Sequence, residues 1–149
     1  MAGTMTKRVV LLSLVVLGGV WLSAQRGPQP LSTDPFNKWA GAQLSTPGAL
    51  GNYGHYSASV QKRDVGAAPE THDGFSHFLM FTSGEGDVIL GGQIVDGPDG
   101  KKMIKGGDRQ KIVLGAIYHI PIKTPHQVVP NPGTSVTYWV TNINVPATK

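Results

Sequence analysis

The chain has no cysteine among its 149 residues. Disulfide bonds, thiolate metal ligands and a lipid-attachment cysteine are therefore excluded. Net charge is small as well: 13 basic residues stand against 9 acidic ones, and Lys7 and Arg8 belong to a segment that we expect to be removed. The remaining excess of basic residues is too weak for a nucleic-acid interface, and no stripe of alternating aromatic and basic residues supports one.

Several common functional motifs are also missing. We find no nucleophile motif, no glycine-rich phosphate loop and no dinucleotide fingerprint, and the glycines of VILGGQ and SGEGD open no helix, so they predict turns. What the chain has instead is 20 glycines, 11 prolines and many β-branched residues. This composition favours a turn-rich β protein, and the length allows one domain with a proper core.

The N-terminal residues 1–24 have the pattern of a cleavable export signal. A basic pair ending at Arg8 precedes the apolar run Val9–Trp21, and the small residues up to Ala24 suit a cleavage site. An uncleaved membrane anchor is the alternative, but the 17 uncharged residues between Arg8 and Arg26 are short for a span that needs about 20. We therefore expect an exported protein, periplasmic or secreted.

Residues 25–54 are expected to form a tether, a short helix and a loop ahead of a barrel domain over residues 55–149. Thr33 or Asp34 can cap the helix, with Pro35 in its first turn. The glycine-rich stretch Thr46–Gly54 predicts a loop. The helix would cover the mouth or side of the barrel with one face, formed by Phe36, Trp39, Ala40 and Leu44.

The rest of the chain consists of short apolar or alternating segments with no convincing helix between them. We expect SGEGD to close a tight hairpin, and Gly115 and Asn131-Pro132-Gly133 to form turns. Short strands at this spacing predict an all-β jelly roll or small barrel. The predicted strands are Tyr56–Arg63, Phe75–Ser83, Asp87–Ile94, Lys111–Leu114, Ile117–Ile120, His126–Val129 and Ser135–Asn144.

The polar stretch Val95–Gln110 interrupts this series. It carries Lys101, Lys102, Lys105 and Arg109 among acidic residues. A basic loop of this kind could hold an anionic substrate, but such a run is more often simply solvated. Both interpretations stay open.

Four side chains carry the main chemical signal. Glu70 and His72 are two residues apart, so on an extended strand they share one face. His77 opens an apolar run after turn residues, and His126 follows two prolines that stiffen the backbone. One carboxylate and three imidazoles suit Fe, Mn, Zn, Ni or Cu. The sequence thus predicts a four-ligand metal site, provided that the fold brings His126 to the other three.

These residues carry a resemblance to the cupin superfamily. The stretch from Glu70 to Gly84 resembles the first cupin motif, G-x5-H-x-H-x(3,4)-E-x6-G, and GAIYHIPIKTPH resembles the second, G-x5-P-x-G-x2-H. In the first motif Glu70 stands at the first His, His72 at the second His, His77 at the Glu and Gly84 at the Gly. In the second motif the Gly, Pro and His positions are held by Gly115, Pro121 and His126.

The resemblance implies a cupin-type double-stranded β-helix, or jelly-roll barrel, with Glu70, His72, His77 and His126 as ligands of one divalent transition metal. One Glu and one His are exchanged relative to the family order, so the full set of ligand types is kept. The chain departs from the pattern at Lys123, which replaces the second motif's internal glycine, and at Ala116, which replaces an acid. The first motif's leading glycine is out of register, with Gly66 the nearest.

Function remains open between classes. Four protein ligands leave one or two positions on a five- or six-coordinate metal, so a metal-dependent enzyme acting on a small polar metabolite is the first hypothesis. The resemblance implies dioxygenase, isomerase or lyase chemistry. No catalytic acid or base is identified, and Tyr118, His55 and Lys123 are only positional candidates. His119 alternates with Tyr118 and is expected at the surface.

The second hypothesis is a non-catalytic cupin module that binds a small ligand or a metal, and the third is a metal-free barrel whose histidines are vestigial. The size of the space around the metal would discriminate between these hypotheses, since an open polar cavity favours an enzyme. The expected partner is a small-molecule substrate or ligand, with no nucleic acid and no membrane after signal cleavage. The resemblance also allows a homodimer, which would form by pairing of exposed edge strands.

Overall fold

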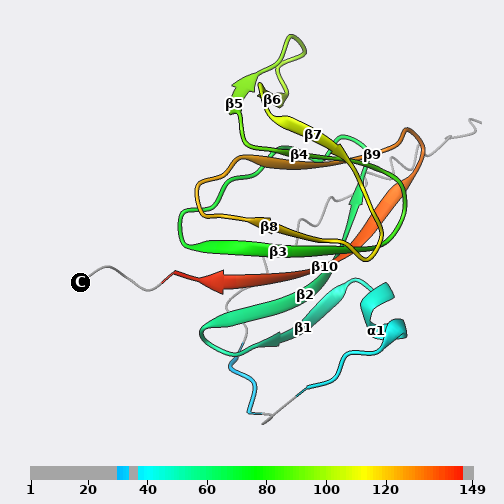
Figure 1. The fold of residues 1–149 in the computed structure, drawn as a ribbon, viewed down its shortest axis with the longest axis vertical. Coiled ribbons are helices and arrows are strands. Elements are labelled where there is room, and N and C mark those ends of the chain that lie inside the picture. The colour runs from blue at the N-terminus through cyan, green and yellow to red at the C-terminus, as the bar shows by residue number, and fades with distance from the viewer. Residues whose placement is uncertain (1–29, 34–36, 146–149) are drawn as a thin grey trace, which may run out of the picture.

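The protein is built from antiparallel strands arranged in two facing sheets (Figure 1). The computed structural model describes residues 30–33 and 37–145. One sheet has the strand order β1-β2-β10-β3-β8, the facing sheet has the order β7-β4-β9, and β5 and β6 form a separate two-stranded hairpin. The strands are β1 (Gly48–Asn52), β2 (Tyr56–Asp64), β3 (Phe75–Ser83), β4 (Gly86–Leu90), β5 (Gln93–Asp96), β6 (Lys102–Lys105), β7 (Asp108–Lys111), β8 (Ile117–Ile120), β9 (His126–Pro130) and β10 (Ser135–Asn144).

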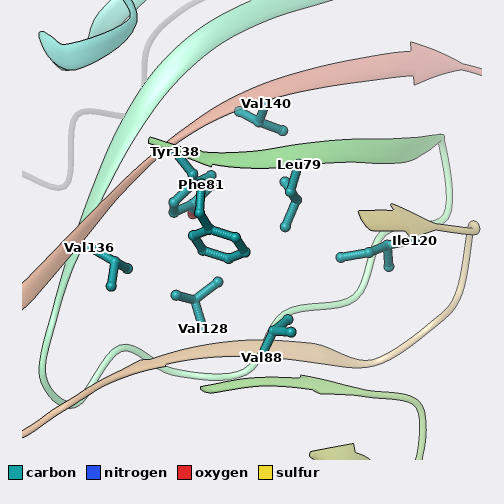
Figure 2. Packing of buried hydrophobic residues seen from close by; sticks show 8 residues of the cluster. All are labelled: Leu79, Phe81, Val88, Ile120, Val128, Val136, Tyr138 and Val140. Carbon is teal, nitrogen blue, oxygen red and sulfur yellow. The ribbon is translucent and has the colours of Figure 1, made fainter. Parts of the chain in front are cut away.

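The hydrophobic core fills the space between the two larger sheets (Figure 2). Alternation along the strands sends every second side chain inward, as the register of β10 with β3 shows: Tyr138 pairs with Phe81, and Val140 with Leu79. Burying each large apolar side chain stabilises the fold by about 1.5–3 kcal/mol. The core residues are Leu79, Phe81, Val88, Ile120, Val128, Val136, Tyr138 and Val140.

Most predicted strands are confirmed, and three coincide with the predicted bounds: Phe75–Ser83, Ile117–Ile120 and Ser135–Asn144. The prediction of one strand over Asp87–Ile94 is wrong about where the strand ends. It ends at Leu90, because Gly91 and Gly92 have φ values of +74° and +76° and turn the chain into β5.

The prediction that SGEGD closes a hairpin is also wrong. β3 and β4 lie in different sheets, so this segment carries the chain from one sheet to the other. Gly84 in this crossing has φ +92°, and a Cβ there would lie 2.7 Å from the Cα of Val136. The motif glycine is therefore required both by its backbone conformation and by the close passage of β10.

The N-terminal part differs from the predicted loop and helix. Gly48–Asn52 is strand β1, paired with β2, where the composition predicted a loop. The helix α1 spans Gly41–Ser45, and residues 37–40, where we expected helix, are not helical. The predicted Asp34 cap, Pro35 and Phe36 lie outside the described residues. At the start of α1 the Ala40 amide donates a hydrogen bond to the side chain of Gln43. The helix contacts β2, β3 and β10, and Thr82 donates a hydrogen bond to the carbonyl of Leu44, so it lies against the five-stranded sheet (Figure 1).

The polar stretch expected over Val95–Gln110 forms the β5–β6 hairpin and β7, which are labelled together at the top of Figure 1. β7 takes Asp108–Lys111, so the strand predicted over Lys111–Leu114 is displaced towards the N-terminus. Arg109 and Lys111 both pair with Asp87 at 2.8 Å, and Lys102 pairs with Asp96 at 2.6 Å. Paired, exposed charges of this kind are typical of a solvated surface.

The expected export signal, residues 1–24, lies outside the described residues. Within the part of the chain that the structure describes, no helix has the length and apolarity needed to cross a membrane.

Candidate metal site

Three histidines from three separate segments meet at one end of the barrel interior. His77 lies on β3 two residues before the core residue Leu79, and His126 begins β9 two residues before Val128. Both side chains are buried, with 7% and 5% of their surfaces exposed. The third, His72, comes from the segment before β3. The inward-facing positions of these strands therefore change from apolar to imidazole at this end of the core.

The geometry of the three imidazoles suits one shared ion. A nitrogen of each of His72, His77 and His126 lies within 4.8 Å of the other two. The ring centroids are 4.6 Å apart for His72 and His77, 5.1 Å for His77 and His126, and 5.4 Å for His72 and His126. The structure thus brings together three of the four predicted ligands, including the distant His126.

Hydrogen bonds at the outer nitrogens orient two of the rings. Nδ1 of His77 lies 2.7 Å from Oδ1 of Asn142, and Nδ1 of His126 lies 3.0 Å from the carbonyl of Thr124. Because these oxygens accept, the neutral rings carry the proton on Nδ1 and keep the lone pair on Nε2. Histidine ligands of metals are usually fixed in this way by a bond at the other nitrogen.

Two of the three inner nitrogens lack a hydrogen-bond partner among the described residues. Among the described residues, Nε2 of His72 and Nε2 of His77 are buried and make no hydrogen bond. A buried polar atom without a partner costs about 1–3 kcal/mol, and binding of an ion at that atom is one of the standard ways to offset the cost. The donor set and these orphaned nitrogens therefore fit a transition metal.

His72 is held from two sides. Its ring stacks on Phe75 with centroids 4.5 Å apart, and its backbone carbonyl accepts a hydrogen bond of 2.7 Å from the amide of Lys123. Lys123 is also the one non-glycine among the described residues with a positive φ, +59°. It occupies the motif position where the family has glycine, so the turn geometry is kept although the residue that favours it is absent.

The fourth predicted ligand, Glu70, lies beside the cluster. It forms an isolated antiparallel bridge with His126, with backbone hydrogen bonds of 2.8 and 2.9 Å. Its Oε1 accepts a short hydrogen bond from Arg63, and its Oε2 lies 3.6 Å from Nε2 of His72. The carboxylate is not part of the group of atoms within 4.8 Å of one another, so its ligation stays a prediction.

The pKa values of His77, His126 and Glu70 favour cation binding at neutral pH. Burial, together with the neighbouring histidines, lowers the pKa of His77 to about 4, and burial lowers the pKa of His126. Burial raises the pKa of Glu70, but the adjacent His72 and the charge of Arg63 outweigh it, so the pKa lies below its ordinary value. At pH 7 both buried imidazoles are neutral and Glu70 is ionised, as ligands must be.

We expect the chelator-treated protein to lose stability as the pH falls from about 6.5 to 4. The unfolded chain protonates His77 near pH 6.5 and the folded chain only near pH 4, so added protons favour unfolding. Each pKa unit is worth about 1.4 kcal/mol, which gives a loss on the order of 2 kcal/mol after allowance for solvent screening. Urea unfolding at a series of pH values measures this slope.

The control for this measurement is His119, which is exposed and stacks on Phe78 at the surface, as the alternation predicted. His77→Leu should flatten the slope between pH 6.5 and 4, while His119→Ala should leave it unchanged. Equal slopes in the wild type and His77→Leu would contradict the depressed pKa.

A small cavity adjoins the cluster. Its volume is about 20 Å³, and His77 and His126 are among the residues that line it. That is room for about one water molecule. The rest of the wall includes polar side chains that the motifs did not contain: Gln61, Arg63, Gln127 and Tyr138.

The positional candidates for a catalytic acid or base do not line this cavity. The hydroxyl of Tyr118 hydrogen-bonds the backbone of Val113 and Lys111, and His55 and Lys123 are exposed. Motif reasoning missed Arg63 and Asn142. Strand alternation gave no signal for Arg63, because the apolar residues Ala58 and Val60 of β2 lie on the opposite face of the strand and predict an outward-facing arginine.

Comparisons with known proteins address the fold. No family model matches the chain, and no curated protein matches its sequence. Among solved structures, protein BH2720 of Bacillus halodurans aligns with a TM-score of 0.54 and 16% identity, over 80% of this chain and 89% of that one. A cupin protein of Bacteroides fragilis, BF4112, aligns with a TM-score of 0.50 and 14% identity, over 78% and 90%.

The cupin domain of Cnp3 from Schizosaccharomyces pombe aligns with a TM-score of 0.51 and 10% identity, over 66% of this chain and 60% of that one. Structural matches at such low sequence identity support a shared fold and say nothing about shared chemistry. The facing antiparallel sheets and these structural matches show that the chain has the fold of cupin proteins.

Proposed function

We propose that the protein binds one divalent transition metal through His72, His77 and His126, with Glu70 as the fourth ligand, and acts as a metal-dependent enzyme on a small polar metabolite. The observation that carries the metal-binding part of this proposal is the convergence of three imidazoles, because the Nε2 atoms of two of them are buried without a hydrogen bond among the described residues. Such nitrogens are costly unless something binds them.

The chain's own residues define what such a site can do. A bound transition metal supplies Lewis-acid or redox chemistry. Phe75 stacks on His72 and meets His77 edge-on at 5.1 Å, so its ring limits access of water from that side. Gln127 also lines the cavity, and because its Nε2 donates to the carbonyl of Ala67 at 2.7 Å, its amide oxygen supplies an acceptor for a polar ligand.

A non-catalytic cupin module that binds a metal or small ligand is the second candidate. The observation that favours it is the size of the cavity, about 20 Å³, which is far below the few hundred Å³ typical of sites for organic ligands. An enzyme built on this chain would therefore have to open its cavity when substrate enters.

The decisive experiment is the metal content of the mature domain, purified without a chelating tag. We expect about one metal per chain in the parent protein and a clear loss in His126→Ala and Glu70→Ala, because each removes one ligand. His119→Ala is the matched control, since it removes a surface imidazole outside the cluster. A folded parent that stays metal-free when offered Fe, Mn, Zn, Ni and Cu would refute the proposal.

A further inference from the structure

We propose that Arg63 is a positioning residue of the metal site. It holds one oxygen of the Glu70 carboxylate, so that the other oxygen faces the histidines and completes the ligand set. This inference rests on the proposed function, because it concerns the same site. It adds a residue that lies outside both motifs and on a different strand, β2.

The two oxygens of Glu70 have different neighbours. Oε1 accepts a hydrogen bond from Nη2 of Arg63, and Oε2 lies 3.6 Å from Nε2 of His72. A separation of 3.6 Å is too long for a hydrogen bond. It matches the spacing of two ligands on one tetrahedral ion, which is roughly 3.3–3.6 Å for bonds of about 2.0–2.2 Å. Arg63 therefore leaves the oxygen that faces the cluster free.

Arg63 is itself fixed by a chain of hydrogen bonds. Its Nε donates to the hydroxyl of Tyr138 at 3.0 Å, and that hydroxyl donates to Oε1 of Gln61 at 3.0 Å. Tyr138 is a core residue with 3% of its surface exposed, and it pairs with Gln61 in the register of β10 and β2. The planar guanidinium can bond Tyr138 and Glu70 at once, in a geometry that a lysine ammonium does not reproduce.

Positioning and charge have opposite effects on metal affinity. The positive charge of Arg63 repels a nearby cation, so if only charge mattered, its removal would tighten binding. If Arg63 orients Glu70, its removal lets the carboxylate turn away from the cluster. Loss of an outer partner of a metal ligand typically weakens affinity by 10–100-fold. The sign of the change therefore separates the two explanations.

The test is the dissociation constant for Zn²⁺ and Co²⁺, measured by competition with a chromophoric chelator. We expect Arg63→Met to bind about 10–100-fold more weakly than the wild type, and Arg63→Lys to fall between them. In a Glu70→Gln background, Arg63→Met should cause no further weakening. The visible absorption of the Co²⁺ protein should change in Arg63→Met in the same direction as in Glu70→Gln.

Two results would overturn the inference: tight binding by Arg63→Met, equal to or better than the wild type, or an equal loss in the Glu70→Gln background. The double variant removes both charges and leaves no unpaired carboxylate, so circular dichroism of this protein separates an effect on affinity from an effect on folding. A wild type that binds neither Zn²⁺ nor Co²⁺ would instead refute the proposed function itself.

Discussion

A divalent transition metal is expected to raise the thermal midpoint of the wild-type protein on the order of 10 °C or more, when its free concentration is about 1,000 times the dissociation constant. Binding to the folded state alone then contributes about 4 kcal/mol, and a domain of this size shifts by a few degrees per kcal/mol. His77→Ala should abolish most of the rise, since it removes a buried ligand near the start of β3. Differential scanning calorimetry with and without metal measures the shift.

The same experiment without metal provides the internal control. There His77 is a neutral imidazole with an unsatisfied Nε2, so in His77→Leu the removal of that buried nitrogen offsets the loss of the hydrogen bond to Asn142, and the net cost in stability should be small. His119→Ala should keep the full metal-dependent shift, because that ring is exposed on the outer face of β8. If the wild type and His77→Ala gain the same number of degrees, the metal binds elsewhere and the histidine cluster is not its site.

The second large effect is expected at Gly84. Gly84→Ala should destabilise the protein by about 3 kcal/mol or more, because two penalties add. A positive φ of +92° costs an L-residue roughly 1–2 kcal/mol, and the new Cβ would lie 2.7 Å from the Cα of Val136, where backbone must shift. Urea unfolding at constant pH measures the loss.

Alanine variants at two other glycines allow these two penalties to be measured separately. Gly133 has φ +75°, and a Cβ added there would meet nothing within 4 Å, so Gly133→Ala should show the conformational cost alone, about 1–2 kcal/mol. Gly74 has neither feature, so Gly74→Ala should change stability little. The idea that β10 passes too close to Gly84 for any side chain fails if Gly84→Ala costs no more than Gly133→Ala.

Most strands could be predicted from local sequence patterns, because such a pattern depends only on the residues within one segment. Alternating apolar residues identified Phe75–Ser83 and Ser135–Asn144 with their observed bounds. The failures are also local. Gly91 and Gly92 divide the segment Asp87–Ile94, which was predicted as one strand, and β1 forms from a glycine-rich stretch because β2 offers it an edge to pair with.

The connection at Gly84 shows that local sequence does not determine which strands pair. A short glycine-containing segment between two strands predicts a hairpin, since hairpins are the usual outcome. Here β3 instead pairs with β10 and β8, and β4 pairs with β9 and β7. The choice between these partners depends on burying two apolar faces against each other, which is a property of the whole domain.

For the site, the sequence by itself determined the donor types: three histidines and a glutamate at motif spacing, with no cysteine to compete. The tertiary structure decided which of them meet. Residues that meet across facing sheets or on paired strands can lie far apart in the chain, so spacing alone could not bring His126 of β9 to His77 of β3 or put Asn142 of β10 behind it. Nor could it show that the Glu70 carboxylate lies between Arg63 and His72, because that arrangement depends on strand pairing across the barrel.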